Sequence, residues 1–247
     1  MSVELSGKVA LVTGGSRGLG AALCVGLAKS GARVMVTGRD PAGVEQTLKT
    51  IRDAGGTARG VTADCTKEED VRKLRREVEN AFGTPELLAT FAGGGGEPMP
   101  TLETSLERWK SVVDANLTTT FLVLREFLPS MRQQGHGSIV TMSSAAARQP
   151  AKASAAYAAA KSAVIVLTRH LAIEVAPVRI NCLAPSATMN ERLAKLPDRV
   201  LSELASAFPL GRIGIPDDIV SAATFLLSDA SSWITGITLD VSGGKIV

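Results

Sequence analysis

Short runs of apolar, β-branched residues alternate along this chain with longer segments of mixed polarity. Six of the runs are apolar on both faces of an extended chain, which is typical of buried parallel strands, and a seventh, at residues 57–62, is weaker. The six runs cover residues 9–13, 33–37, 86–91, 138–142, 178–183 and 237–241. Because the segments between the runs are long enough for crossover helices, the pattern predicts an α/β fold with a doubly wound, seven-stranded parallel sheet flanked by helices on both faces.

Helix signals agree with this alternation. Helices are expected to begin at Asp40 with its following proline, after Thr66, and at Pro216. Glycines are expected to end three helices, at Gly31, Gly55 and Gly83. The pattern also predicts two long helices, at residues 105–131 and 153–176.

Residues 185–209 form a long stretch that carries no strand signal. In folds of this class such a length usually serves as a lid or a binding segment. No linker, repeat or low-complexity stretch divides the 247 residues. We therefore expect a single domain, residues 1–247, with a substrate lid at about residues 185–210.

Composition excludes several classes of protein. Apolar residues make up 45% and charged residues 21% of the chain, the mix of an ordinary globular protein. Basic and acidic residues interleave and sum to a net charge of +3, so we expect no nucleic-acid groove. Since no apolar run reaches the roughly 18 residues of a membrane span, we expect neither a membrane segment nor a signal peptide. Cys24, Cys65 and Cys182 lie far apart without metal-ligand spacing, which predicts no disulfide, no metal site and a cytoplasmic location.

A glycine-rich loop, Thr13-Gly-Gly-Ser-Arg-Gly-Leu-Gly20, follows the first predicted strand and opens the first predicted helix. Glycines at positions 14, 18 and 20 remove the Cβ atoms that would block a tight turn, the approach of a pyrophosphate and close helix–strand packing. The helix N-terminus supplies N–H groups and a positive dipole. This context predicts a Rossmann-type dinucleotide site, and the expected binding residues in the loop are Gly14, Ser16, Arg17, Gly18, Leu19 and Gly20.

The end of the second strand predicts which dinucleotide binds. NAD-binding proteins usually place an acidic residue there to hold the ribose 2′-hydroxyl. This chain has Gly38 and Arg39 instead, so we expect NADP (NADPH) to bind, with Arg39 and Arg17 contacting the 2′-phosphate. Asp64, after the third strand, is expected to accept a hydrogen bond from the adenine amino group, although a helix-capping role fits its chemistry equally well.

Tyr157 and Lys161 lie four residues apart on the second long predicted helix, and therefore on one face of it. An ammonium group beside a phenol favours the phenolate, so we expect Lys161 to lower the pKa of Tyr157 and make it a usable acid or base. Ser143 and Ser144 end a predicted strand at the carboxyl edge of the sheet, where ligands bind in this class of fold. Asn116 falls inside a predicted helix, an unfavourable place unless its amide bonds to something.

With these motifs in place, the sequence closely resembles the short-chain dehydrogenase/reductase family over essentially its whole length. The motifs that carry the resemblance are the loop at residues 13–20, Asp64, Ala92-Gly93, Asn116, Ser144, Tyr157, Lys161, the stretch Asn181 to Pro185, and the tail from Ile234 to Gly244. The resemblance implies a catalytic tetrad of Asn116, Ser144, Tyr157 and Lys161. In it Tyr157 exchanges a proton with the substrate oxygen, Ser144 bonds that oxygen, Lys161 holds the nicotinamide ribose, and Asn116 anchors a proton-relay water. It also implies cofactor contacts from Ala92, Gly93, Tyr157, Lys161, Pro185 and Thr188.

Three departures from the family pattern stand out. The family's Asn-Asn-Ala-Gly stretch reads Thr90-Phe91-Ala92-Gly93, so side-chain bonds that brace the central sheet must be replaced, and we expect a structural cost rather than lost chemistry. Ser186 stands where a glycine usually follows the proline at the nicotinamide amide, although Thr188 remains nearby. Asn190 replaces a threonine, which we expect to alter closure over the cofactor.

Function is interpreted on this basis as the NADPH-dependent reduction of a carbonyl group, resembling the 3-oxoacyl thioester reductase branch. The alternatives are an NAD(P)-dependent dehydrogenase of ketones, sugars or steroid alcohols, and a non-catalytic dinucleotide-sensing protein, which would be expected to lack the proton-transfer pair. A carrier-bound acyl chain would want exposed basic residues near the cleft, for which Arg125, Arg132 and Arg169 are candidates. The resemblance and the two long apolar-faced helices also predict a homotetramer.

Overall fold

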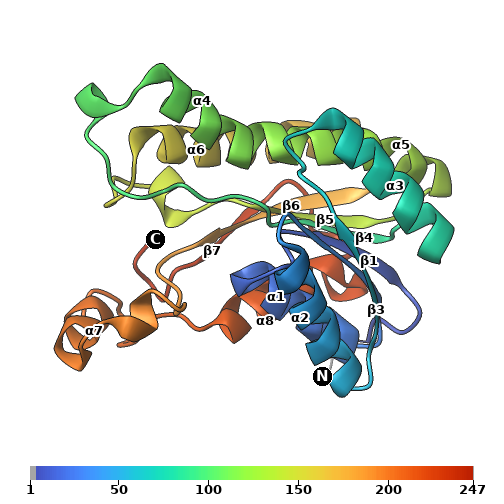
Figure 1. Cartoon of the computed structure of the whole chain (residues 1–247), viewed down its shortest axis with the longest axis horizontal. Helices are drawn as coiled ribbons and strands as arrows, with labels where there is room; N and C mark the ends of the chain where they lie inside the picture. The colour runs from blue at the N-terminus through green and yellow to red at the C-terminus, as the bar shows by residue number, and fades with distance from the viewer. Residues whose placement is uncertain (1–3, 247) are drawn as a thin grey trace.

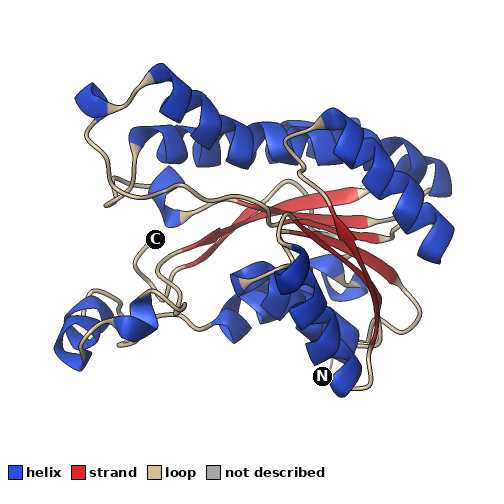
Figure 2. Cartoon of the chain, in the orientation of Figure 1, coloured by secondary structure: helices blue, strands red, loops and turns tan. Residues whose placement is uncertain are grey.

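The computed structural model describes residues 4–246 and contains one seven-stranded sheet (Figures 1 and 2). Every neighbouring pair of strands is parallel, and the strand order is β3-β2-β1-β4-β5-β6-β7. The strands are β1 (Val9–Thr13), β2 (Arg33–Gly38), β3 (Thr57–Thr62), β4 (Leu87–Thr90), β5 (Ser138–Met142), β6 (Arg179–Pro185) and β7 (Thr238–Val241). The predicted doubly wound parallel sheet is confirmed.

Helices cover both faces of the sheet, as Figure 1 shows. One face carries α3 (Glu68–Phe82), α4 (Leu106–Val113), α5 (Thr119–Gln134) and α6 (Ala155–Glu174). The other carries α1 (Gly18–Lys29), α2 (Pro41–Asp53) and α8 (Pro216–Leu227). The short helix α7 (Asp198–Ala205) lies apart from both layers, within the segment between β6 and α8.

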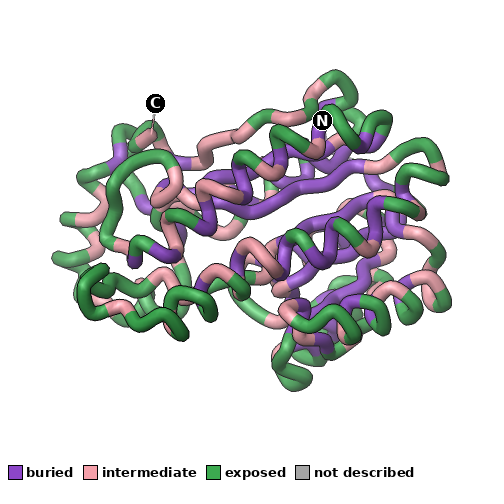
Figure 3. Tube along the Cα trace, turned by 90° about the horizontal axis from the view of Figure 1, so that it is seen from above, coloured by how far each residue is buried: buried purple, intermediate pink, exposed green. Residues whose placement is uncertain are grey.

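The sheet separates the apolar core into two layers. Figure 3 colours the buried stretches of the chain purple. On β1, Ala10 and Val12 pack on the side of α1 and α8, whereas Leu11 packs on the side of α3 and α5. This alternation explains why the predicted strands are apolar on both faces, since each face is covered by helices. Burial of one such side chain contributes about 1.5–3 kcal/mol. The edge strand β3 is mostly exposed, which explains its weaker signal.

All three predicted helix starts are confirmed to within two residues. The Asp40 carboxylate accepts a hydrogen bond from the amide N–H of Ala42 at 3.1 Å, and Pro41 begins α2. Pro216 begins α8. Thr66 does not cap α3, because its hydroxyl and its N–H both donate to the carboxylate of Asp64, and α3 begins two residues later. The expected helix-ending glycines, Gly31, Gly55 and Gly83, have φ angles of +91°, +77° and +90°.

The first long predicted helix is not one regular helix. Residues 106–134 form α4, a π-helical turn at Asp114–Thr118, and then α5. The buried Asn116 lies in the wide turn. A π turn contains an extra residue per turn, and such turns often occur at functional sites. Within residues 4–246, no helix is long and apolar enough to cross a membrane.

Candidate active site

The glycine-rich loop and the carboxyl ends of β2, β3 and β4 enclose a cavity of about 420 Å³. Ten of the predicted cofactor residues line it: Gly14, Ser16, Arg17, Gly18, Leu19, Gly20, Arg39, Asp64, Ala92 and Gly93. The other predicted cofactor residues, Tyr157, Lys161, Pro185 and Thr188, are not among its lining residues. The structure therefore gathers the adenine-side and pyrophosphate-side residues into one hollow.

The shape of this hollow depends on glycine. Gly14 has a φ of +72°, and a Cβ atom there would lie 2.8 Å from backbone atoms of Phe91 and Ala92. A Cβ atom on Gly20 would lie 2.2 Å from the carbonyl oxygen of Gly14. Gly18 has a φ of +56° and open space around it. Close approach therefore requires glycine at positions 14 and 20, and the positive φ favours glycine at position 18. The cradle fits a pyrophosphate at a helix N-terminus.

Gly38 has a second role that the sequence analysis missed. A Cβ atom on Gly38 would lie 2.7 Å from the hydroxyl oxygen of Ser16, and one on Gly43 would lie 2.6 Å from the Ser16 carbonyl oxygen. The side chain of Ser16 therefore occupies the space where an acidic residue at position 38 would begin. No local sequence signal reveals this contact, because the residues come from different elements.

Asp64 forms its observed bonds within its own turn. Its carboxylate accepts hydrogen bonds from the N–H of Thr66 at 3.1 Å and from the Thr66 hydroxyl at 2.8 Å. Burial alone would raise the pKa of Asp64, but these bonds and the charges of Arg39 and Lys67 outweigh it, so the pKa is lowered. Arg17 and Arg39 are both exposed at the rim of the hollow.

Lys161 is buried at the N-terminal half of α6, with 3% of its surface exposed. Its Nζ donates a hydrogen bond to the carbonyl oxygen of Met142 at 2.8 Å and lies 5.7 Å from the centre of the Tyr157 ring. Burial lowers the pKa of Lys161 to about 8, an effect that a charge on Cys182 would oppose. The i, i+4 spacing thus brings the amine and the ring together as predicted.

The electrostatic expectation for Tyr157 is wrong. Burial raises the pKa of its phenol, and the hydrogen bond with Ser144 lowers it only in part. Lys161 is not among the causes of this shift, and its Nζ donates to the carbonyl oxygen of Met142. The spacing of the two residues predicted their proximity but not the burial of both.

Asn116 ties the π turn to the glycine run after β4. Its Nδ2 donates to the carbonyl oxygens of Gly94 and Val112, both at 2.8 Å, and its Oδ1 accepts from the N–H of Gly94 at 3.2 Å. A Cβ atom on Gly93 would lie 2.6 Å from Asn116 Oδ1 and 3.3 Å from Lys161 Nζ. Gly93 therefore sits between these two side chains, and the amide of Asn116 has the partners that its helical position required.

The two serines after β5 have different partners. Ser143 is buried and donates to the carbonyl oxygen of Lys161 at 2.8 Å, which agrees with a structural role. Ser144 begins the 3₁₀ turn η3 (Ala145–Ala147), and its hydroxyl accepts from the N–H of Ala146 at 3.2 Å. Gly96 approaches the other side of the site, since a Cβ atom there would lie 3.0 Å from ring atoms of Tyr157. The glycine run thus lets backbone pass over the tyrosine ring.

The departures from the family pattern have visible consequences. The Thr90 hydroxyl is buried and has no hydrogen-bond partner among residues 4–246, which is the structural cost expected from losing an asparagine there. The N–H of Ser186 donates to the carbonyl oxygen of Val241 at 3.1 Å, and the Thr188 hydroxyl donates to the Ser186 carbonyl oxygen at 3.2 Å. Asn190 accepts from the N–H groups of Arg192 and Leu193, each at 3.0 Å, and so stabilises the turn of η4 (Leu193–Lys195).

The described part of the chain lacks a cluster of metal-binding side chains. Residues 4–246 contain no group of three or more histidine, cysteine, aspartate or glutamate side chains placed to hold an ion.

Comparison with known proteins identifies related chains over the full length. Residues 14–245 match the family model described as enoyl-(acyl carrier protein) reductase. The chain is 35% identical to the 2,5-dichloro-2,5-cyclohexadiene-1,4-diol dehydrogenase LinX of Sphingobium indicum, over 99% of this chain and 98% of that protein. It is 34% identical to the 3-oxoacyl-[acyl-carrier-protein] reductase FabG of Aquifex aeolicus, over 99% of each chain. A short-chain type dehydrogenase/reductase from Mycobacterium ulcerans superposes with a TM-score of 0.93 at 32% identity, covering 98% of this chain and 91% of that one.

Proposed function

This chain belongs to the short-chain dehydrogenase/reductase family and is a nicotinamide-dependent oxidoreductase, and from that premise we propose that it reduces a carbonyl substrate with NADPH, with Tyr157 as the proton donor. The observation that carries the proposal is the cluster formed by Asn116, Ser144, Tyr157 and Lys161 beside the dinucleotide cradle.

Preference for NADPH is supported by the groups at the end of β2. Gly38 offers no acid to a ribose 2′-hydroxyl, and Arg17 and Arg39 line the same hollow. An arginine pair can hold a phosphate through charge-assisted hydrogen bonds. The contact between Gly38 and Ser16 adds a steric reason why this position cannot simply gain an acidic side chain.

Each side chain of the cluster has a distinct task in the proposed mechanism. When bound, the nicotinamide supplies a hydride to the carbonyl carbon or accepts one from the alcohol carbon. The Tyr157 hydroxyl donates its proton to the substrate oxygen, and Ser144, which bonds to that phenol, helps to position the same oxygen. Lys161 would hold the nicotinamide ribose, and Pro185 and Thr188 would add contacts to the nicotinamide end of the cofactor. Asn116 holds the glycine run after β4 in place through its hydrogen bond to Gly94. It would also anchor a relay water.

A panel of ketones and thioesters, read by the loss of NADPH absorbance, tests this proposal. Turnover of at least one ketone, lost in Tyr157→Phe, is the expected result. The sequence interpretation favours a 3-oxoacyl thioester as the substrate. The alternatives are ketones, sugars and steroid alcohols, and the same panel distinguishes these substrate classes. Arg125, one candidate for carrier docking, already forms an ion pair with Glu68. Complete absence of turnover with intact NADPH binding would favour a dinucleotide sensor.

We also propose one domain with a lid at about residues 185–210, a homotetramer and a cytoplasmic location. The isolated position of α7 supports the lid. Large apolar side chains stay exposed on the outer helices, with Phe121, Val166 and Ile173 at 44%, 64% and 87% exposure, which supports association through α5 and α6. All three cysteines are free thiols, which fits a reducing compartment. A monomeric mass in solution at micromolar concentration would exclude the tetramer.

A further inference from the structure

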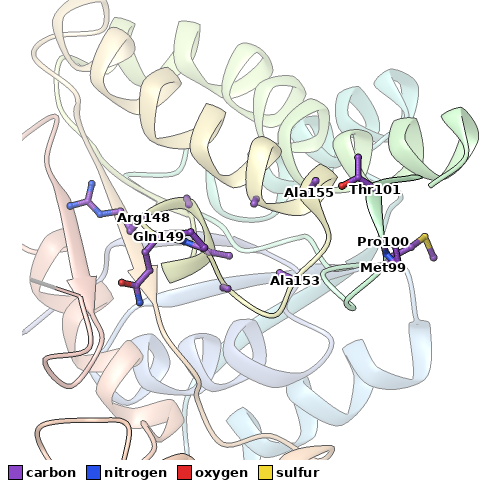
Figure 4. A pocket seen from close by; sticks show the side chains of 12 residues that line it. Met99, Pro100, Thr101, Arg148, Gln149, Ala153 and Ala155 are labelled. Atoms are coloured by element: carbon purple, nitrogen blue, oxygen red, sulfur yellow. The ribbon is translucent and has the colours of Figure 1, made fainter. Parts of the chain in front are cut away.

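A cavity of about 540 Å³ lies between the segment at Met99 and the turn at Gln149 (Figure 4), and it contains none of the residues predicted to bind the cofactor. The dinucleotide hollow is a separate space, and its shape depends on side chains behind its wall as well as on those that line it. Gly14 and Ser16 line the hollow, whereas the buried Gly15 between them does not. The contacts of Gly15 therefore hold two lining residues from behind.

Three elements fix the position of Gly15. Its N–H donates to the carbonyl oxygen of Thr37 on β2 at 2.8 Å. A Cβ atom on Gly15 would lie 2.9 Å from the side chain of Val36 and 3.0 Å from the sulfur of Cys24 on α1, so no free space remains on that side. Its carbonyl oxygen accepts a hydrogen bond from the hydroxyl of Thr47 on α2 at 2.9 Å. Within residues 4–246, this hydroxyl is the one donor to that carbonyl.

Thr47 is the polar exception on the buried face of α2. The other buried residues of that helix are apolar: Val44, Leu48 and Ile51. A buried hydroxyl costs free energy unless it is hydrogen-bonded. The Thr47 hydroxyl also lies 3.1 Å from the carbonyl oxygen of Gly43, one turn earlier, but that carbonyl has an N–H donor within the helix. Because a hydroxyl has one proton to donate, the shorter distance and the unmet acceptor both favour Gly15.

The bond to Thr47 also sets the direction of a neighbouring N–H. In a trans peptide unit the C=O and the N–H point in opposite directions. Holding the Gly15 carbonyl on Thr47 therefore turns the N–H of Ser16 away from Thr47. In the described part of the chain this N–H has no acceptor, although Ser16 lines the hollow just before the N-terminus of α1. An unpaired N–H at that place is a ready donor for a phosphate or ribose oxygen.

We propose that Thr47 is a positioning residue for the dinucleotide, and that its hydroxyl holds the Gly15–Ser16 peptide so that the Ser16 N–H faces the bound cofactor. Thr47 does not line the hollow and acts through Gly15. This role rests on the dinucleotide cradle of the proposed function, and it does not depend on which substrate is reduced. Valine at position 47 would keep the shape of the side chain but release the peptide, whereas serine would keep the bond.

Equilibrium binding of the cofactor to three variants tests this role. Titration with NADPH, followed by cofactor fluorescence, should give a Kd about fivefold higher for Thr47→Val than for the wild type, the effect of losing about one net hydrogen bond. Thr47→Ser keeps the hydroxyl and should bind almost as tightly as the wild type. Thr50→Val removes a hydroxyl that donates to the Gln46 carbonyl on the exposed side of α2, so it is the matched control and should bind as the wild type does. The same order of variants is expected with NADH, because the peptide belongs to the backbone of the loop.

Stability measured in parallel separates positioning from simple support of the fold. Urea denaturation without cofactor gives the free energy of unfolding of each variant. If Thr47→Val lowers this free energy but leaves the Kd of the folded protein unchanged, the role is wrong. A Kd for Thr47→Ser as high as that for Thr47→Val would also overturn it, since the hydroxyl would then not be the group that matters. Should Thr47→Val not fold, Thr47→Ala removes the same hydroxyl, and the same rise in Kd is required of it.

Binding also keeps this role distinct from the proposed reaction. If no substrate is reduced, the reductase assignment fails, but the order of the Kd values still decides the role of Thr47. If NADPH binds no more tightly than NADH, the cofactor preference fails, and the comparison of Thr47→Val with Thr47→Ser stands for both cofactors.

Discussion

Replacing Lys161 with methionine should stabilise the fold while removing turnover. Burial lowers the pKa of this lysine from 10.5 to about 8, so the folded protein at pH 7 holds an ammonium group in an environment that disfavours it. At about 1.4 kcal/mol for each pKa unit, the penalty is about 3 kcal/mol. Methionine fills similar space without a charge but loses the hydrogen bond to Met142, which contributes about 1 kcal/mol. The net gain in the free energy of unfolding should be about 2 kcal/mol.

The pH dependence of this gain identifies its cause. Between pH 8 and 10.5 the unfolded lysine binds a proton that the folded one has released, so the stability of wild-type protein rises over this interval relative to the variant. The advantage of Lys161→Met should therefore be full at pH 7 and largely gone at about pH 10.

Urea denaturation of both proteins at pH 7 and near pH 9.5 measures the difference, with NADPH left out. Lys49→Met, on the exposed side of α2, is the control and should show no such trend. A variant that is less stable than wild type at pH 7, or a gain that does not change with pH, would refute the reasoning.

Three further predictions concern single groups. Tyr157→Phe should abolish ketone reduction while NADPH affinity and thermal unfolding stay close to wild type, because the ring remains; undiminished turnover would show that another group donates the proton. Arg39→Ala should weaken NADPH binding by about 1.5–3 kcal/mol with little effect on NADH, as measured by fluorescence titration, whereas Arg52→Ala, in the last turn of α2, should have no effect. Thr90→Val should raise the free energy of unfolding by about 1 kcal/mol, since it replaces an unpartnered buried hydroxyl by a methyl group of similar size; a loss of stability in urea would mean that this hydroxyl has a partner.

Sequence patterns were sufficient for the sheet because each strand is buried by helices on both faces. The predicted bounds of β1, β3 and β5 match the structure, and the cradle residues follow from a glycine motif whose steric reason is local. The Tyr157 and Lys161 pair was also accessible, since helical spacing alone places the two side chains together.

Features that depend on contacts between distant elements were not accessible. The packing of Ser16 against Gly38 joins the glycine-rich loop to the end of β2, and the hydrogen bond of the Lys161 amine depends on the carbonyl of Met142 on a neighbouring strand. The π turn at Asn116 leaves no mark in apolar periodicity, because one extra residue shifts the pattern only slightly over so short a stretch.

The wide turn at Asp114–Thr118 also limits how the length of this chain can vary. A π turn closes over five residues where an α-helical turn closes over four, so it absorbs one extra residue. Removing one residue there would restore regular α-helical geometry and leave α5 in nearly the same orientation, at the cost of the position of Asn116. Removing one residue from the regular part of α5 before Phe127 would instead rotate everything beyond it by about 100°, and the fully buried Phe127 and Met131 would turn away from the sheet. A single-residue deletion should therefore keep the buried face of α5 when it falls in the wide turn and disrupt that face when it falls in the first turns of α5.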